Sequence, residues 1–178
     1  MKRIAVVCGL LGFVVCLCCL APAPQQNADY LRIHIRADSN EQSAQEVKYK
    51  VKAAVVEYLT PYLAYAGDKR AAEKVVRAHL RDLEQVANKV LDTEGFDYTC
   101  HAELRQENFP CRTYGNLTLQ SGIYDALILN LGSGSGNNWW CVVYPPLCFV
   151  GGENNGTNGI TYRSLLVEII NKFFAEHK

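Results

Sequence analysis

The chain has 178 residues, which accommodates one domain of ordinary size together with a short targeting segment. Lysine plus arginine and aspartate plus glutamate are balanced at 18 each, and no run of five like charges occurs. A balanced chain without a basic stretch lacks the electrostatic footprint of nucleic-acid binding, so DNA and RNA are excluded as leading partners.

The N-terminus carries the pattern of an export signal. Lys2 and Arg3 precede uncharged, mostly apolar residues over positions 4–20, which is the pattern that the export machinery reads. The sequence Ala-Pro-Ala at 21–23 resembles a cleavage site, but we expect Pro24 directly after it to slow signal peptidase. An uncleaved membrane anchor is the alternative, because a helix over 4–20 rises about 25 Å, near the lower limit for spanning a bilayer. We therefore predict an export signal or anchor over residues 1–21, a linker over 22–29 and one domain over 30–178.

The domain is expected to begin with a strand followed by a helix. Residues 30–36 alternate apolar with polar side chains, which predicts a strand with one buried face and a basic face, Arg32, His34 and Arg36, pointing outward. Residues 38–40, Asp-Ser-Asn, then offer candidates for a helix N-cap. The helix that follows has an apolar stripe at helical spacing, and we expect it to end near Pro61.

The rest of the chain predicts a second helix, several strands and a last helix. The second helix covers residues 68–93, and strand-like runs follow at 98–104 and 124–131, with residues 109–122 between them rich in turn residues. The glycine and serine residues at 132–136 predict a flexible loop. A strand at 139–144 and a helix at 162–177 complete the order, which indicates an α+β domain with helices on one face of a mainly antiparallel sheet.

Four cysteines lie beyond the export segment, at Cys100, Cys111, Cys141 and Cys148. An even number fits an exported domain, because thiols outside the cytosol tend to be oxidised. Three connectivities are possible, and we favour Cys100 with Cys111 and Cys141 with Cys148, since each pair closes a short loop. A zinc site is the rival interpretation, although the spacings differ from the C-x2-C pairs typical of structural zinc.

The paired tryptophans Trp139 and Trp140 are the most informative local feature. Neighbouring strand residues face opposite sides, so one ring is a candidate contact for a partner, unless the glycine-rich loop covers it. That loop does not predict nucleotide binding, because a phosphate-binding loop opens a helix, whereas a strand follows here. The sequence predicts no catalytic residue, no cofactor and no metal.

Several segments together resemble the stage II sporulation protein R family. Residues 32–39, Arg-Ile-His-Ile-Arg-Ala-Asp-Ser, resemble its opening strand and helix cap, and residues 48–59 its first helix. Residues 122–127 and 132–149 resemble its signature, in which two tryptophans, two prolines and two cysteines recur at a specific spacing. The departures are Asp38 where asparagine is expected, Gln-Ser at 120–121 in place of Pro-Ala, and the additional cysteines Cys100 and Cys111.

The resemblance implies a protein made in the forespore and exported into the space between forespore and mother cell. There it would activate a membrane-embedded aspartic receptor protease, which processes the precursor of the early mother-cell sigma factor. On this interpretation the domain is a ligand and no enzyme, and it meets a membrane only through its N-terminal segment. An extracellular cell-wall hydrolase and a polymer-binding module of the spore envelope are the alternatives. The candidate contact residues are Arg32, His34, Arg36, Asn137, Asn138, Trp139 and Trp140.

Overall fold

The computed structural model describes residues 29–115, 117–149 and 157–176, and in the last segment it describes side chains from residue 166 onward. The predicted export segment and residues 22–28 of the predicted linker lie outside this range. Among the helices of the described residues, none combines the length and the apolar character that a membrane span requires.

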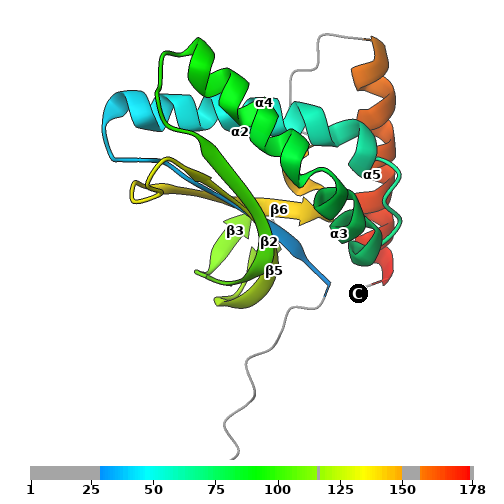
Figure 1. Ribbon diagram of the computed structural model, residues 1–178. Coiled ribbons are helices and arrows are strands. Elements are labelled where there is room, and N and C mark those ends of the chain that lie inside the picture. Colours follow the sequence, from blue (N-terminus) through cyan, green and yellow to red (C-terminus); the bar gives the residue numbers. More distant parts are fainter. Residues whose placement is uncertain (1–28, 116, 150–156, 177–178) are drawn as a thin grey trace, which may run out of the picture.

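A four-stranded sheet forms the centre of the domain (Figure 1). Its strands are β1 (Leu31–Arg36), β2 (Cys100–Phe109), β5 (Gly122–Leu131) and β6 (Asn138–Tyr144). They lie in the order β2-β5-β1-β6, with β1 parallel to β5 and both other pairs antiparallel. The predicted α+β class with a mainly antiparallel sheet is confirmed.

The helices pack against one face of the sheet (Figure 1). They are α2 (Gln42–Leu63), α3 (Lys69–Ala78), α4 (Leu80–Thr93), α5 (Thr157–Glu176) and the short 3-10 helix η1 (Leu147–Phe149). Alternate residues of the strands point toward them and form the main core, because side chains of a strand alternate between its faces. The fully buried members include Ile33, Ile35, Leu129 and Val143 from the sheet, and Val51, Val55, Leu83 and Leu91 from the helices.

The other face of the sheet carries a second, smaller core. A hairpin of β3 (Arg112–Tyr114) and β4 (Leu117–Leu119) forms within the segment that the sequence predicted as turns, and its Gly115 has a φ of +58°. The hairpin packs beside a cluster that contains Phe109, Leu119, Tyr124, Ala126, Ile128 and Val142. Among the described residues, the buried members of this cluster all come from strands, and Leu147 of η1 packs against it.

Two helices occupy the segment where the sequence predicted one. His79 breaks the helix between α3 and α4 with φ −105° and ψ 9°, and its ring lies 4.1 Å from that of Tyr62 on α2. The periodicity could not reveal this break, because buried Val76 and Leu83 keep a seven-residue spacing across it. Helix α2 also continues to Leu63, two residues past the expected end at Pro61.

The outer edge of β2 is capped by side chains of α4 where the strand begins. Asn88 Oδ1 accepts a hydrogen bond from the Cys100 N–H at 2.6 Å, and Glu84 Oε1 accepts one from the Ala102 N–H at 2.8 Å. The strand was expected at residues 98–104. It starts two residues later and continues to Phe109, opposite the full length of β5.

Candidate functional site

The glycine-rich loop at 132–136 is hydrogen-bonded to the residues that follow β1. Asp38 Oδ1 accepts a hydrogen bond from the Ser133 N–H at 2.7 Å. The hydroxyls of Ser133 and Ser135 both donate to the Asp38 carbonyl, at 2.7 and 2.8 Å. The prediction of a flexible loop is therefore wrong, because three hydrogen bonds to a single residue hold it.

Asn40 and Lys48 fix the start of β6. Asn40 Oδ1 accepts the Asn137 N–H at 2.7 Å, and Lys48 Nζ donates to the Asn137 carbonyl at 3.1 Å. Lys48 is buried although its position lies off the expected apolar stripe of α2, because its ammonium finds acceptors there. The helix begins after Glu41 without a side-chain cap, so the predicted capping role of residues 38–40 is wrong and two of these side chains bind the loop instead.

The structure brings the predicted contact residues together on two neighbouring strands. In the antiparallel register of β1 with β6, His34 lies opposite Trp140 and Arg36 opposite Asn138. Trp140 belongs to the second core and Trp139 packs against the main core, so the expectation that the two rings face opposite sides is confirmed. Neither tryptophan is fully exposed.

Arg32 is completely buried, so the prediction that it points outward is wrong. Its guanidinium lies 4.2 Å from the ring centre of Phe109 and 4.8 Å from that of Tyr124, which are cation–π distances. Its Nη2 donates to the Tyr114 hydroxyl at 2.7 Å, while Nε and Nη1 find no acceptor among the described residues. Arg32 therefore ties the β3–β4 hairpin to the sheet from beneath.

His34 is also buried, and its predicted outward direction is likewise wrong. Its ring stacks on Trp140 with centroids 3.6 Å apart and planes 20° from parallel. Its Nδ1 lies 3.1 Å from Glu107 Oε1. Burial lowers the pKa of His34, and this effect outweighs the hydrogen bonds from Asn138 and Glu107 that raise it. The ring is therefore held in its neutral form at neutral pH.

Glu107 joins the basic residues of this face. Its carboxylate accepts a hydrogen bond from Arg36 Nη2 on the oxygen that also lies near His34. Its second oxygen lies 3.0 Å from Arg105 Nη2, an ion-pair distance without hydrogen-bond alignment. The Glu107 side chain is only 10% exposed, so these charges interact in a partly desolvated setting. Sequence reasoning missed Glu107, because it comes from β2, 71 residues away from Arg36.

A partner can reach only part of the predicted contact set. Asn137 and Asn138 are exposed, and Arg36 and Trp140 are half-buried at the surface. These four residues lie next to one another where the glycine-rich loop enters β6, and we name them the rim. His34 lies beneath it and Arg32 lies beneath the β3–β4 hairpin, so these two buried residues can influence a partner only through the side chains that they support.

Cys141 and Cys148 form a disulfide that joins β6 to η1, as predicted. The other predicted pair is wrong, because Cys100 and Cys111 are both free. Cys100 begins β2 and Cys111 lies two residues past its end, and the ten residues of the strand extend about 30 Å, far beyond the reach of a disulfide. Cys100 is buried against the helices and Cys111 is exposed, and burial raises the pKa of the Cys100 thiol to about 12.

Acidification should destabilise the fold through His34. Burial lowers its pKa below the ordinary 6.5, so below that pH the unfolded chain takes up a proton that the folded chain resists. The contribution of His34 to stability is therefore full above about pH 7 and decreases as the pH falls through about 6.5. Chemical unfolding at pH 7.5 and 5.5 measures the difference, which should shrink in His34→Gln. The exposed His101 is the matched control, and a pH dependence that disappears in His101→Gln but not in His34→Gln would contradict the assignment.

The sequence is similar to a known protein family and to a curated relative. The family model described as Stage II sporulation protein R (spore_II_R) matches residues 27–154, which include all strands, the glycine-rich loop and the Cys141–Cys148 disulfide. Stage II sporulation protein R of Bacillus subtilis (strain 168) is 32% identical over 124 residues, which cover 70% of this chain and 55% of that protein. The chain thus matches little more than half the length of this curated relative, and no solved structure matches it. The chain belongs to the stage II sporulation protein R family.

Proposed function

We propose that this chain is an exported signal that activates a membrane-embedded aspartic receptor protease during sporulation. It is made in the forespore and crosses into the space between forespore and mother cell, where it meets the receptor. The activated protease then processes the precursor of the early mother-cell sigma factor. Family membership over residues 27–154 is the observation that carries this proposal.

Two features of the chain support export. Residues 1–21 have the basic and apolar pattern of an export signal or membrane anchor. The disulfide between Cys141 and Cys148 fits a compartment outside the cytosol, because thiols are kept reduced inside it. Both features agree with a domain that acts after it has crossed the forespore membrane.

The rim, Arg36, Asn137, Asn138 and Trp140, is our proposed receptor contact. A half-buried tryptophan at the surface, surrounded by polar groups, is typical of the residues that dominate binding energy. His34 holds this ring from below by stacking at 3.6 Å, so the ring loses little freedom when a partner covers it. The domain acts as a ligand: it activates its receptor by binding the active state more tightly than the inactive one.

Reconstitution tests the proposal directly. The receptor protease and the sigma-factor precursor are placed together in membranes, and precursor cleavage is measured with and without the exported chain. Cleavage should depend on the chain and saturate as its concentration rises, as binding to a receptor requires. Equal cleavage without the chain would refute the proposal. Sustained release of fragments from peptidoglycan by the chain alone would instead identify a cell-wall hydrolase.

The variant Asn137→Glu should reduce receptor activation about tenfold without changing the thermal midpoint of unfolding. Asn137 is exposed, and its backbone N–H and C=O, which hold the strand start, remain in the variant. The new carboxylate adds a charge that the partner surface must then desolvate without a matched cation. Asn171→Glu, at an exposed position of α5, is the matched control and should activate normally. Equal activation by both variants would exclude the rim as the contact.

Replacing Trp140 with alanine is a less clean test of the rim than replacing Asn137. The ring lies 3.6 Å from His34 and 4.7 Å from Phe109, so its removal empties part of the second core. Loss of signalling in such a variant would mix lost contact with lost packing. The exposed asparagine beside it avoids this ambiguity.

A further inference from the structure

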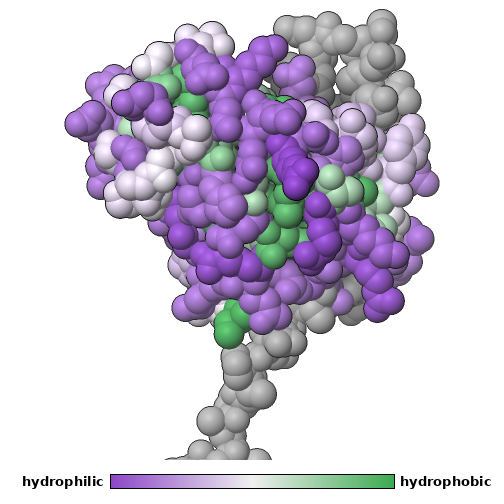
Figure 2. All heavy atoms as spheres, in the orientation of Figure 1, coloured by the Kyte–Doolittle hydropathy of each residue, from purple (hydrophilic) through white to green (hydrophobic). Residues whose placement is uncertain are grey.

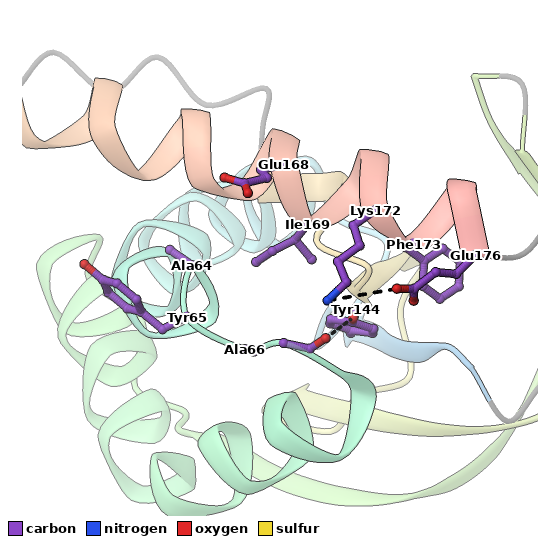
Figure 3. A pocket seen from close by; sticks show the side chains of 10 residues that line it. Ala64, Tyr65, Ala66, Tyr144, Glu168, Ile169, Lys172, Phe173 and Glu176 are labelled. Carbon is purple, nitrogen blue, oxygen red and sulfur yellow. Dashed lines mark hydrogen bonds and ion pairs between the residues drawn. The ribbon is translucent and has the colours of Figure 1, made fainter.

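Two adjoining hollows form a groove at the end of β6 that lies away from the rim. The first hollow, of about 240 Å³, lies between the end of α2, the connection from α2 to α3, and α5 (Figure 3). The second, of about 670 Å³, continues from it along the start of α3. The two share Gly67, Tyr144, Phe173 and Glu176 in their walls, so they are parts of one continuous groove.

The first half of the groove has both apolar and charged walls, and the apolar share is slightly larger. Figure 3 shows Ile169 and Lys172 pointing from α5 toward the chain segment that holds Ala66. Tyr144 closes the floor, where its hydroxyl donates to the Gly67 carbonyl at 3.0 Å. Tyr65 forms part of the wall and is 74% exposed, the largest exposed fraction among the large apolar side chains of the described residues. A wall of this kind favours an apolar side chain from outside the domain.

The second half of the groove is acidic. Across the walls of both halves six carboxylates face three cations: Asp29, Asp68, Glu73, Asp125, Glu168 and Glu176 against Lys69, Arg70 and Lys172. Lys69 is already engaged, because its Nζ lies 2.5 Å from Asp125 Oδ2 and 3.4 Å from Glu73 Oε1. The difference of three negative charges in a chain of zero net charge marks this groove as a place that attracts cations.

We propose that the groove binds an extended segment of a partner protein in which one apolar side chain is followed by basic residues. The apolar half receives the hydrophobic side chain, and the carboxylates of the other half face the lysine or arginine that follows it. The chain's own residues 22–28 lead directly into the groove wall at Asp29, but they contain no lysine or arginine and lack this complementarity.

This groove is a second contact surface, separate from the rim. The seven residues of β6 place Tyr144 about 20 Å from Asn138. One partner could reach both surfaces, or two partners could bind together. Binding at the groove does not require that the rim contacts a receptor protease, so each proposal can fail without the other.

The test uses a dye-labelled, end-blocked heptapeptide, Gly-Gly-Phe-Lys-Lys-Gly-Gly, and the full-length oxidised protein kept in solution with a non-ionic detergent. Fluorescence anisotropy should show saturable binding that weakens as salt is added. A peptide with glutamates in place of the lysines, and one with alanine in place of phenylalanine, should each bind about tenfold more weakly. Equal binding of the charge-reversed peptide, or no binding of any peptide, would overturn the proposal.

Two pairs of variants locate the binding. Tyr65→Ser and Glu176→Lys should weaken binding of the lysine peptide about fivefold. Tyr49→Ser, which removes a tyrosine 51% exposed outside the groove, and Glu57→Lys on the exposed face of α2 should bind as the unchanged protein does. Unaltered binding by Tyr65→Ser would place the peptide elsewhere and refute the groove. Sedimentation would also refute the proposal if the protein self-associates and Tyr65→Ser abolishes this association, because a second copy of the chain would then be the occupant of the groove.

Discussion

Replacing Gly136 with alanine should lower the free energy of unfolding by about 3 kcal/mol. A Cβ at this position would lie 2.2 Å from the Ser39 carbonyl oxygen and 2.5 Å from its carbon. Both are backbone atoms, so no side-chain rotation relieves the clash. The Gly136 N–H also donates to the Ala37 carbonyl at 2.9 Å, so the loop cannot move away without losing that hydrogen bond. The glycine is therefore required for close approach of two backbones.

Denaturant unfolding of Gly136→Ala measures this loss, and Gly67→Ala is the matched control. A Cβ at Gly67 meets no atom within 4 Å, so this second variant should change the free energy of unfolding by less than about 1 kcal/mol. Gly136→Ala should also reduce receptor activation, because the loop carries Asn137 into the rim. Similar stabilities for the two variants would show that Gly136 does not pack against the Ser39 backbone.

Replacing Glu107 with alanine should lower the free energy of unfolding by about 3 kcal/mol, because it removes the carboxylate that His34 and Arg36 share in a partly desolvated setting. The buried His34 loses the carboxylate 3.1 Å from its Nδ1, and Arg36 loses one of its two hydrogen-bond acceptors and keeps Asn130 Oδ1. The penalty arises from the groups left behind, since a desolvated donor without an acceptor keeps its full desolvation cost. Stability measured by denaturant unfolding at pH 7.5 shows the size of this loss.

The neighbouring Glu103 provides the control for Glu107. It lies on the same strand and pairs with Arg105 at 2.9 Å, but its side chain is 35% exposed. Surface ion pairs contribute little, so Glu103→Ala should change stability by less than about 1 kcal/mol. Glu107→Gln, which keeps one acceptor oxygen, should lie between the two alanine variants. A Glu107→Ala variant as stable as Glu103→Ala would contradict the role of Glu107 as the shared acceptor.

The sequence predicted the sheet and helix layers of this domain because apolar residues recur at regular spacings along its strands and helices. The alternation over residues 30–36 and the helical spacing of Val51 and Val55 place the right side chains in the main core. Alternation alone interprets the polar positions of a strand as exposed, and for Arg32 and His34 this was wrong. They are buried because a hairpin and Trp140, distant in sequence, cover that face.

The predictions made from residue spacing and local motifs were wrong where contacts between residues distant in sequence determine the structure. Cys100 and Cys111 are close in sequence, but the strand between them is extended and keeps their thiols apart. Asp38 has the chemistry of a helix cap, yet a loop 95 residues away provides the N–H that it binds. The family motif pointed to Trp140 as a candidate contact, whereas Glu107, which contacts the His34 ring stacked on it, depends on a strand pairing that no local pattern contains.

The sulfur of Cys148 also covers part of the free edge of strand β6. It accepts the Val142 N–H at 3.3 Å, and β6 is the last strand of the order on that side. An uncovered strand margin is a template on which other chains can assemble. A copy whose thiols are still reduced is free to move this sulfur away and expose that template. Oxidation would then protect the protein from aggregation as well as joining two segments of the chain.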